Sequence, residues 1–443
     1  MEKYLVYGLG ISGISSVKTL CSLKNEVYIY DEKNEEDLKD VFKELEGYNY
    51  TWIKDIDEGL EKAEVLLKSP GIPVHNPIVK KALEKGLEVV SDLELVTRLF
   101  PDRKIVAVTG TNGKTTTTTL MKEILIGCGL KAKAIGNIGL GMLWEIYNGE
   151  KNEVFVIECS SFQLANTYKF HPQYSAIINI SPDHLDWHGN YEEYIKAKKN
   201  IFKNQNSSDF TVINIDNPEL NEMLQEIPSR IIKTNANEQS GDVFVEEGKI
   251  YSKLDGKKDF LLKVEDIPIK GSHNVENVLI ALGLSLAMNL DMEKAGQTIR
   301  TFQAVEHRLE FVREIKGVEY YNDSKGTNVD ASIKAIEAFH RPIILLAGGY
   351  DKKADLTPLF EVMKNRVKHL VLFGATRELF AEYAADYGIK AELVESMYEA
   401  VNRAHCLSDE GDIVLLSPAS AAWGMYDNFE IRGRDFKKKV REL

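Results

Sequence analysis

Cysteine, basic residues and long apolar segments are all scarce in this sequence. Only four cysteines occur among 443 residues, and they form neither a CxxC pair nor a cluster with histidine. We therefore expect no disulfide framework and no structural zinc site. The same shortage is typical of a protein that works in the reducing cytoplasm.

The shortage of basic residues bears on the partners of the protein. Lysine and arginine number 55 against 68 aspartate and glutamate residues, which gives a formal net charge of −13. Non-specific binding to nucleic acid needs a broad basic surface, so we expect no nucleic-acid partner. Local basic pockets for an anionic substrate stay compatible with this balance.

No segment has the pattern of a signal peptide or a membrane span. The N-terminus passes from one lysine into a short apolar run that glycine interrupts. The most apolar helix candidate, at residues 278–288, contains Gly283 and Ser285 and is too short to cross a bilayer. We therefore expect no association with a membrane.

Strands and helices alternate along the whole chain, which is typical of parallel α/β units. The alternation predicts three domains, at residues 1–95, 96–304 and 305–443, with a hinge around Pro101. After Asn235 the pattern changes to short polar pieces separated by glycine, which indicates a small antiparallel excursion. The predicted fold class is α/β with three domains.

A glycine-rich turn follows the first predicted strand. Gly8, Gly10 and Gly13 form a GxGxxG pattern before a helix, and Asp31 ends the next strand. Such a turn lets backbone N–H groups approach a pyrophosphate, while the acidic residue meets a ribose hydroxyl. Alone, the pattern favours an NAD-dependent oxidoreductase, although many α/β folds need glycine at such a turn.

A second glycine loop indicates another kind of phosphate site. It lies between a strand and a helix and consists of Gly110, Thr111, Asn112, Gly113, Lys114, Thr115 and Thr116. In such loops backbone donors surround the phosphates, the lysine reaches the terminal phosphate, and the next hydroxyl binds magnesium. Val108 stands where the strict P-loop has a further glycine. The loop predicts ATP and Mg²⁺ as cofactors, and an oxidoreductase would leave it without a role.

One lysine lies on the apolar side of a predicted helix. With residues placed at 100° intervals, Lys198 falls at the centre of an apolar stripe, while neighbouring lysines point away. The stripe contains Tyr191, Tyr194, Ile195, Ile201 and Phe202, and the lysines that point away are Lys196, Lys199 and Lys203. A charge among such neighbours is costly unless it is paired, neutralised or modified. This position favours a functional role for Lys198.

Two predicted strands of the second domain end in polar residues. Glu158 closes one strand, and Asp183 and His184 follow another. Carboxylate and imidazole groups at strand ends beside a phosphate loop suit a magnesium site and the positioning of a substrate. His184 alone would equally suit a capping or core role.

A series of motifs gives the chain a specific resemblance. The motifs GTNGKTT, ECSSFQL, SPDHLDWHG, GSHNVENVLIA, EHRLE, NDSKGTN and LSPASAAWGMYDNFEIRG occur in this order. On these motifs the chain resembles the Mur ligases over nearly its whole length. Together with the start GLGISG and the stretch SPGI, they favour the members that add D-glutamate to UDP-N-acetylmuramoyl-L-alanine.

The resemblance implies a fold and a set of nucleotide contacts. The three domains would be a Rossmann-like UDP-binding domain, a P-loop-type ATPase domain and a Rossmann-like, amino-acid-binding domain, in a monomeric protein. The residues implied around the UDP substrate are Gly10, Ile11, Ser12, Gly13, Asp31, Ser69, Gly71, Asn137, Ser160 and His184. Those implied around ATP, beyond the glycine loop, are Asn274, Asn277, Arg308 and Asp323.

The resemblance also assigns the metal and the incoming amino acid. Lys198 matches the family lysine that carbon dioxide carbamylates, which would give Mg²⁺ an oxygen ligand beside Thr115, Glu158 and His184. The implied D-glutamate contacts are Lys325, Thr327, Lys352, Ala422 and Phe429. Two positions depart from the family pattern, because Ala422 replaces a serine and Gly424 replaces a common aspartate.

The implied reaction is amide synthesis through an acyl phosphate. The substrate carboxylate attacks the γ-phosphate of ATP, and the amine of D-glutamate then displaces phosphate. The residues expected to act in this reaction are Lys114, His184, Lys198, Arg308 and Lys325.

Three alternatives to this reaction stay open. A related ligase is one, although folylpolyglutamate synthase lacks the N-terminal nucleotide domain. An NAD-dependent oxidoreductase would explain only the first glycine turn. A catalytically silent nucleotide-binding module would make Glu158, His184 and Lys198 accidental.

Overall fold

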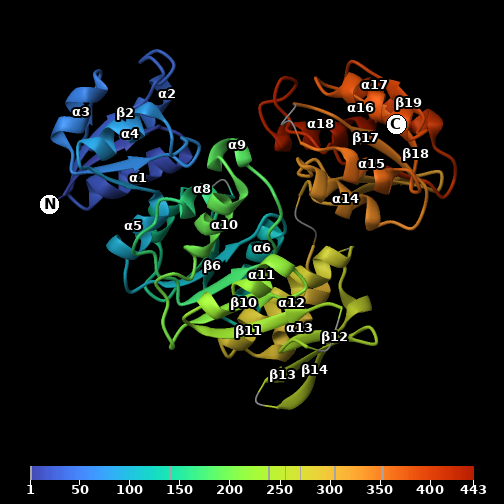
Figure 1. Cartoon of the computed structure of the whole chain (residues 1–443), viewed down its shortest axis with the longest axis horizontal. Coiled ribbons are helices and arrows are strands. Elements are labelled where there is room, and N and C mark those ends of the chain that lie inside the picture. The colour runs from blue at the N-terminus through green and yellow to red at the C-terminus, as the bar shows by residue number, and fades with distance from the viewer. Residues whose placement is uncertain are drawn as a thin grey trace. The chain divides into compact units, whose positions relative to one another are not determined.

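The computed structural model describes residues 2–138, 141–237, 240–254, 256–269, 271–303, 306–350 and 354–443. Tertiary contacts divide the chain into two compact units. One comprises Met1–Asp266 and Glu276–Arg300, and the other comprises Ile267–Val275 and Thr301–Leu443. The first unit contains two sheets and the second contains one (Figure 1). The boundaries of the three predicted domains stay a prediction.

The first sheet is parallel and has the strand order β3-β2-β1-β4-β5. Its strands are β1 (Lys3–Tyr7), β2 (Glu26–Tyr30), β3 (Thr51–Trp52), β4 (Val65–Lys68) and β5 (Glu88–Val90). The helices are α1 (Ile11–Ser22), α2 (Lys39–Glu44), α3 (Ile56–Lys62), α4 (Pro77–Glu84) and α5 (Asp92–Leu99). In this Rossmann-like sheet the order in which the strands are added reverses between β1 and β4. Parallel sheets commonly bind ligands at such a position.

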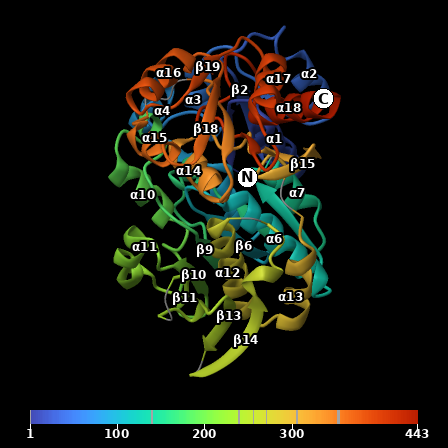
Figure 2. The same ribbon diagram turned by 90° about the vertical axis from the view of Figure 1, so that its right-hand side faces the viewer.

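The second sheet has nine strands in the order β14-β13-β12-β11-β10-β9-β6-β8-β7. They are β6 (Lys104–Thr109), β7 (Ala132–Gly136), β8 (Val154–Glu158), β9 (Tyr174–Ile177), β10 (Phe210–Asn214), β11 (Arg230–Asn235), β12 (Val243–Glu246), β13 (Lys249–Leu254) and β14 (Lys257–Lys263). Strands β6 to β11 pair in parallel, whereas β12, β13 and β14 pair antiparallel at one end of the sheet (Figure 2). The predicted antiparallel excursion is confirmed.

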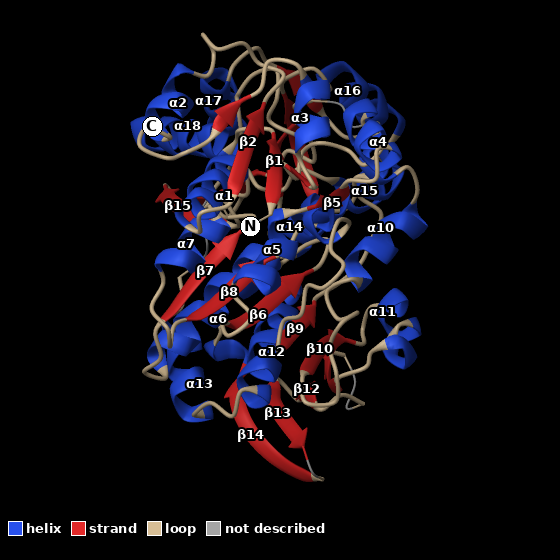
Figure 3. Ribbon diagram, turned by 90° about the vertical axis from the view of Figure 1, so that its left-hand side faces the viewer, coloured by secondary structure: helices blue, strands red, loops and turns tan. Residues whose placement is uncertain are grey.

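Helices connect the strands of this second sheet (Figure 3). They are α6 (Lys114–Gly127), α7 (Met142–Asn148), α8 (Ser161–Leu164), α9 (Leu185–His188), α10 (Tyr191–Lys199), α11 (Pro218–Glu222), α12 (Ser272–Ala287) and α13 (Met292–Thr301), with 3-10 turns at Leu224–Glu226 and Val264–Asp266. In the part of the chain that the structure describes, every helix is too short or too polar to cross a bilayer.

The third sheet belongs to the second unit and has the order β15-β16-β20-β17-β18-β19. Its strands are β15 (Glu310–Ile315), β16 (Val318–Asn322), β17 (Ile343–Ala347), β18 (Val367–Leu372), β19 (Ala391–Leu393) and β20 (Ile413–Leu416), and its helices are α14 (Val329–Glu337), α15 (Thr357–Met363), α16 (Arg377–Asp386), α17 (Met397–Leu407) and α18 (Phe429–Glu442). Alternate residues of β17 enter two apolar clusters. Because both faces of this sheet are buried, its central strands β17 and β20 read as continuous apolar runs.

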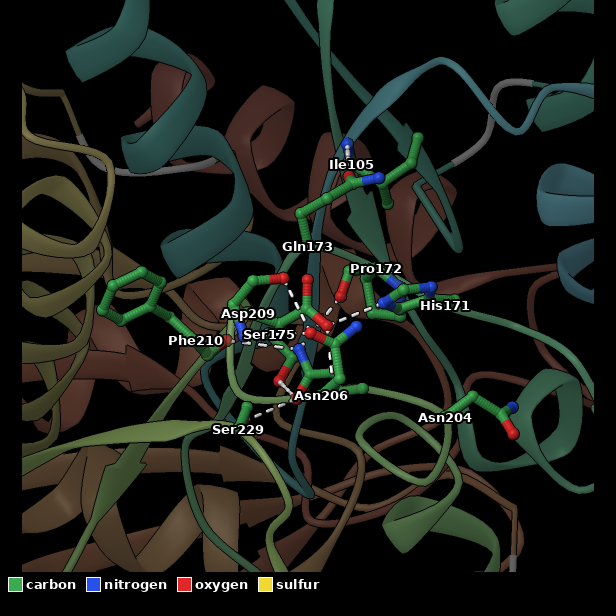
Figure 4. Close-up of polar contacts among 12 residues, drawn as sticks. Ile105, His171, Pro172, Gln173, Ser175, Asn204, Asn206, Asp209, Phe210 and Ser229 are labelled. Carbon is green, nitrogen blue, oxygen red and sulfur yellow. Dashed lines mark hydrogen bonds and ion pairs between the residues drawn. The ribbon is translucent and has the colours of Figure 1, made fainter.

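A buried polar network anchors the start of β9 and β10, at the edge of the second sheet away from the phosphate loop (Figure 4). The Gln205 side-chain oxygen accepts hydrogen bonds from Thr211 Oγ1 at 2.6 Å, Ser229 Oγ at 2.9 Å and Ser175 Oγ at 3.4 Å. Its amide nitrogen donates to the carbonyl oxygens of Pro172 at 2.9 Å and Phe210 at 3.2 Å. This one side chain therefore supplies hydrogen bonds to five polar groups.

We expect Gln205→Leu to destabilise the first unit strongly. Leucine has a similar volume but removes the amide donors and acceptor of Gln205, at a cost of about 1–3 kcal/mol for each buried group left without a partner. Thermal unfolding followed by circular dichroism measures the loss. Gln297→Leu, at an exposed position on α13, is the control. Equal melting temperatures for the two variants would show that the network contributes little.

Candidate active site

The phosphate loop joins β6 to α6 and is tied to the segment that follows β9. Thr111 Oγ1 lies 2.8 Å from the Tyr194 hydroxyl and accepts a hydrogen bond from the Ser181 backbone N–H at 2.9 Å. The backbone N–H of Asn112 donates to Asn179 Oδ1 at 2.9 Å. These bonds fix the loop ahead of the N-terminus of α6, where backbone N–H groups and the helix dipole favour an anion.

Two lysines converge on a single carbonyl group of this loop. Lys114 Nζ donates to the Gly110 carbonyl oxygen at 2.9 Å and to that of Thr111 at 2.8 Å, and Lys198 Nζ donates to the Gly110 oxygen at 2.7 Å. Burial lowers the pKa of Lys198 well below its ordinary value, and the positive charge of Lys114 lowers it further. The surroundings of Lys198 therefore favour the neutral amine form of its side chain.

The position of Lys198 confirms the interpretation of the helical pattern. Its side chain is 1% exposed, with Nζ 4.7 Å from the centre of the Tyr194 ring, whereas the side chain of Lys196 is 73% exposed. The expected extent of the helix was wrong. Helix α10 ends at Lys199, so Ile201 and Phe202 lie in the turn after it, although both remain buried. The turn continues the apolar side because it packs into the same cluster.

Glu158 ends β8 beside the loop and is bonded to a second predicted residue. Asn137 Nδ2 donates to Glu158 Oε1 at 3.0 Å, and the Asn137 backbone N–H donates to the Glu158 carbonyl oxygen at 3.0 Å. The other carboxylate oxygen, Oε2, is buried and has no hydrogen-bond partner among the described residues. Thr116 Oγ1 is buried in the same way. Buried oxygens of this kind are the ligands that Mg²⁺ prefers.

His184 and Ser160 lie on short segments that follow β9 and β8. His184 adopts a left-handed backbone, with φ 53°, and begins helix α9. Its ring packs edge-on against Phe162 at 4.7 Å, with Nε2 3.5 Å from Asp183 Oδ2. Ser160 caps α8 through reciprocal hydrogen bonds with Gln163. A left-handed conformation is uncommon for a residue other than glycine and is typical of functional sites.

The N-terminal glycine turn meets the end of β4 where the first sheet reverses its order. Ser69 Oγ donates to the Gly8 carbonyl oxygen at 2.8 Å. A side chain at Gly13 would place its Cβ 2.0 Å from that oxygen, so the helix can approach the turn only with glycine there. Asp31 accepts hydrogen bonds from the backbone N–H groups of Leu9 at 2.7 Å and Lys33 at 3.0 Å. Asp31 thus reaches the turn, as predicted, and its contact with a ribose stays a prediction.

Four other predicted substrate and ATP residues lie at the ends of the first sheet and on helix α12. Gly10 caps α1 and Gly71 follows β4, and both have open space where a side chain would stand. Asn274 and Asn277 are buried on α12. Asn277 Oδ1 accepts a hydrogen bond from Thr117 Oγ1 of α6 at 3.3 Å. Asn277 therefore contacts the helix that carries the phosphate loop.

In the second unit, Arg308 and Asp323 lie together. Leu309 N donates to Asp323 Oδ1 at 3.3 Å, and Ser417 Oγ donates to Oδ2 at 2.8 Å. Burial raises the pKa of Asp323 to about 6, and the charge of Arg308 opposes that rise. Arg308 Nε is buried and has no hydrogen-bond partner in the described ranges. This nitrogen is a donor suited to a phosphate oxygen.

The predicted D-glutamate residues lie partly within the described chain. Lys325 Nζ lies 5.2 Å from the centre of the Phe429 ring, and Lys325 N donates to the His307 carbonyl oxygen at 3.1 Å. Thr327 N donates to the Lys325 carbonyl oxygen at 2.9 Å. Lys352 lies outside the described residues.

The two departures from the family pattern lie in one loop after β20. Ala422 is 4% exposed, and its carbonyl oxygen accepts a hydrogen bond from Tyr426 N. Gly424 has φ +90°, a left-handed conformation that costs little only for glycine. The conformation of the loop therefore accounts for glycine at 424, while the structure gives no comparable reason for alanine at 422.

The structure also shows residues that the sequence reasoning missed. Asn179, Asp92 and Gln163 lie within hydrogen-bond reach of predicted residues or of their partners. Asn179 lies just after a buried strand. That position in the sequence could have identified it as a candidate site residue. Asp92 lies in a Ser-Asp-x-Glu stretch typical of any helix start, so nothing in the sequence distinguished it.

Three family models match successive parts of the chain, and all three describe domains of one family. The Mur ligase MurD-like N-terminal domain matches residues 2–91, the Mur ligase middle domain matches residues 108–285, and the Mur ligase glutamate ligase domain matches residues 307–420. The chain belongs to the Mur ligase family.

Two full-length relatives show which kind of Mur ligase this chain is similar to. The UDP-N-acetylmuramoylalanine–D-glutamate ligase of Alkaliphilus oremlandii is 42% identical over 100% of this chain and 98% of its own length. The ligase of the same name from Clostridioides difficile is 39% identical over 100% of this chain and 99% of its own length.

Solved structures of more distant relatives share the fold. The UDP-N-acetylmuramate-alanine ligase MurC of Thermotoga maritima has a TM-score of 0.63 at 18% identity and covers 100% of both chains. The MurF ligase of Thermotoga maritima, solved in complex with ADP, has a TM-score of 0.57 at 17% identity and covers 87% of this chain and 91% of its own.

Proposed function

We propose that this protein is an ATP-dependent ligase that joins D-glutamate to UDP-N-acetylmuramoyl-L-alanine in the cytoplasm, releasing ADP and phosphate. The observation that carries the proposal is the cluster of Lys114, Lys198 and Glu158 at the phosphate loop, because it supplies cations and buried oxygens where a phosphoryl group transfers. Identity of about 40% over the full length to ligases of this name supports the choice of substrates. Peptidoglycan precursor synthesis is the pathway, and the family expectation is a monomer.

The loop and α6 bind the triphosphate of ATP in this proposal. The backbone N–H groups before Lys114 surround the phosphates, and Lys114 Nζ exchanges its carbonyl partners for the terminal phosphate. Asn274 and Asn277 lie on the adenine side, Arg308 contacts a phosphate and Asp323 contacts the ribose.

The residues beside the loop fit a magnesium ion. Glu158 Oε2 and Thr116 Oγ1 are buried oxygens without a partner among the described residues, and Thr115 and His184 stand on the adjoining segments. When bound, Mg²⁺ neutralises the charge of the transferring phosphoryl group. The donors proposed for it are Thr115, Glu158, His184 and carbamylated Lys198.

The burial of Lys198 supports the proposal that this lysine is carbamylated. The neutral amine attacks carbon dioxide, so that a C–N bond forms, one proton is released and the amine becomes an anionic carbamate. The low pKa of Lys198 favours the amine that reacts. The product is an anion beside the cation of Lys114, which removes the repulsion between the two side chains.

Positioning and charge neutralisation perform the proposed reaction. Asn137, Ser160 and His184 hold the muramoyl part of the substrate, so that its carboxylate reaches the γ-phosphate and forms an acyl phosphate. The amine of D-glutamate, held by Lys325, Thr327, Lys352 and Phe429, then attacks the acyl carbon, and phosphate leaves. Arg308 and Lys325 stabilise the charge that develops.

The direct test is phosphate release from ATP and Mg²⁺, with the amino acids supplied one at a time. We expect release to require both UDP-N-acetylmuramoyl-L-alanine and D-glutamate. Turnover of a nicotinamide cofactor without release of phosphate, or ATP binding without any turnover, would reject the proposed function.

Ala422→Ser tests the D-glutamate site. A restored hydroxyl adds one hydrogen bond to the substrate, so we expect the KM for D-glutamate to fall by up to about tenfold, equivalent to about 1.4 kcal/mol. Initial rates at saturating ATP and UDP substrate measure this change. Ala421→Ser adds the same group one residue earlier and serves as the control. An unchanged KM in Ala422→Ser would place this residue outside the binding site.

A further inference from the structure

A buried carboxylate is bonded to a helix of the proposed UDP-substrate site. Asp92 is the first residue of α5 and is only 3% exposed. Its two oxygens accept hydrogen bonds from Gln163 Nε2 at 3.1 and 3.4 Å. Burial raises the pKa of Asp92, and the side chains of Gln163 and Ser12 oppose that rise. Asp92 therefore ties the start of α5 to helix α8.

The bond from Asp92 sets the orientation of Gln163 and, through it, of Ser160. A carboxylate only accepts, so it fixes the amide nitrogen of Gln163 toward Asp92 and the amide oxygen toward Ser160. That oxygen accepts from Ser160 N at 3.1 Å and from Ser160 Oγ at 3.0 Å, while Gln163 N donates to Ser160 Oγ at 3.2 Å. The direction of the Ser160 hydroxyl is thus determined by a charge on α5.

A second buried charged side chain, that of Lys68, ends strand β4. Lys68 is 1% exposed, donates to the Ile72 carbonyl oxygen at 2.8 Å and lies 5.1 Å from the centre of the Trp187 ring. Burial lowers the pKa of Lys68 to about 8, and the charge of Asp92 opposes that shift. Lys68 thereby connects the loop that contains Ser69 and Gly71 to α9, the helix that begins after His184.

Another buried acid on the same helix shows what a purely structural role looks like. Glu94 accepts hydrogen bonds from the backbone N–H groups of Tyr168, Lys169 and Phe170 at 2.8 to 3.1 Å, and it pairs with Arg98. The three backbone partners lie in one connecting segment, Arg98 lies on α5 itself, and none of the four is a predicted substrate residue. Asp92 instead reaches the predicted substrate residue Ser160 through Gln163.

We propose that Asp92 is a positioning residue that, through Gln163, aligns Ser160 for the uridine-nucleotide substrate. The inference rests on the proposed function, because that function makes Ser160 a substrate contact. Asparagine at this position would keep the size of the side chain but would allow Gln163 to rotate its amide. The ATP loop shares none of these hydrogen bonds, so the effect is confined to one substrate.

Asp92→Asn tests the proposal against Glu94→Gln as the matched control. We expect Asp92→Asn to raise the KM for UDP-N-acetylmuramoyl-L-alanine about tenfold or more and to leave the KM for ATP within about twofold. Glu94→Gln is expected to lower the melting temperature without changing either KM. Gln163→Met breaks the same connection from its other end and should reproduce the effect if Asp92→Asn folds poorly.

Calorimetric titration with UDP-N-acetylmuramoyl-L-alanine keeps this inference separate from the proposed function. Weaker binding in Asp92→Asn and Gln163→Met, with unchanged binding in Glu94→Gln, supports the positioning role even if the unmodified protein turns over no D-glutamate. Binding that is equal in all four proteins, or a parallel rise in the KM for ATP, overturns it. Absence of turnover by the unmodified protein would reject the proposed function alone.

Discussion

Lys198→Ala is expected to lower kcat by about a thousandfold or more, equivalent to about 4 kcal/mol of transition-state stabilisation. The variant loses the side chain that we propose is carbamylated and provides an anionic ligand beside Glu158. It also leaves a cavity next to Tyr194, so thermal unfolding must show that the variant is folded. Phosphate release at saturating substrates measures the effect.

Lys199→Ala is the control for this change. Lys199 is the next residue of α10, but its side chain is partly exposed and pairs with Glu226 on the surface, so its removal should leave kcat unchanged. Depletion of carbon dioxide should reduce the activity of the unmodified protein, and bicarbonate should restore it. A ¹³C signal from labelled bicarbonate should be present in the unmodified protein and absent from Lys198→Ala. Full activity without carbon dioxide would contradict the metal-ligand role.

The features that the sequence predicted are those that local spacing determines. The strands at 105–108 and 343–346 are continuous apolar runs because both faces of a parallel sheet are buried. The inward position of Lys198 followed from the 100° rotation per residue of a helix. Both inferences needed only neighbours along the chain.

Other features depend on contacts between distant segments. The bond between Asn137 and Glu158 joins two strand ends, and the bond between Asp92 and Gln163 joins two helices. Residue type and spacing do not encode such partners, so Asp92 could not be distinguished from Glu94, which lies two residues away. The resemblance to the Mur ligases gave Asn137 a role, but it did not indicate that this side chain also orients Glu158.

Lys114→Met is expected to lower kcat/KM for ATP by about a thousandfold. Methionine keeps the apolar length of the side chain but removes the cation that reaches the terminal phosphate. Since we propose that this cation contacts the γ-phosphate, calorimetry should show a larger loss of affinity for ATP than for ADP. Lys122→Met, on the same helix and paired with Glu123 at the surface, is the control. Equal losses for ATP and ADP would place Lys114 away from the terminal phosphate.

The same substitution should also change the chemistry of Lys198. The positive charge of Lys114 lowers the pKa of Lys198, so its removal raises that pKa and leaves more of the side chain as ammonium at a given pH. Ammonium does not react with carbon dioxide, and the ¹³C carbamate signal should therefore require a higher pH in Lys114→Met than in Lys122→Met. Lys114 and Lys198 both bond to the Gly110 carbonyl, and this proximity has a chemical consequence. The charge of Lys114 keeps the amine of Lys198 reactive. An identical pH dependence in both variants would show that burial alone controls the amine.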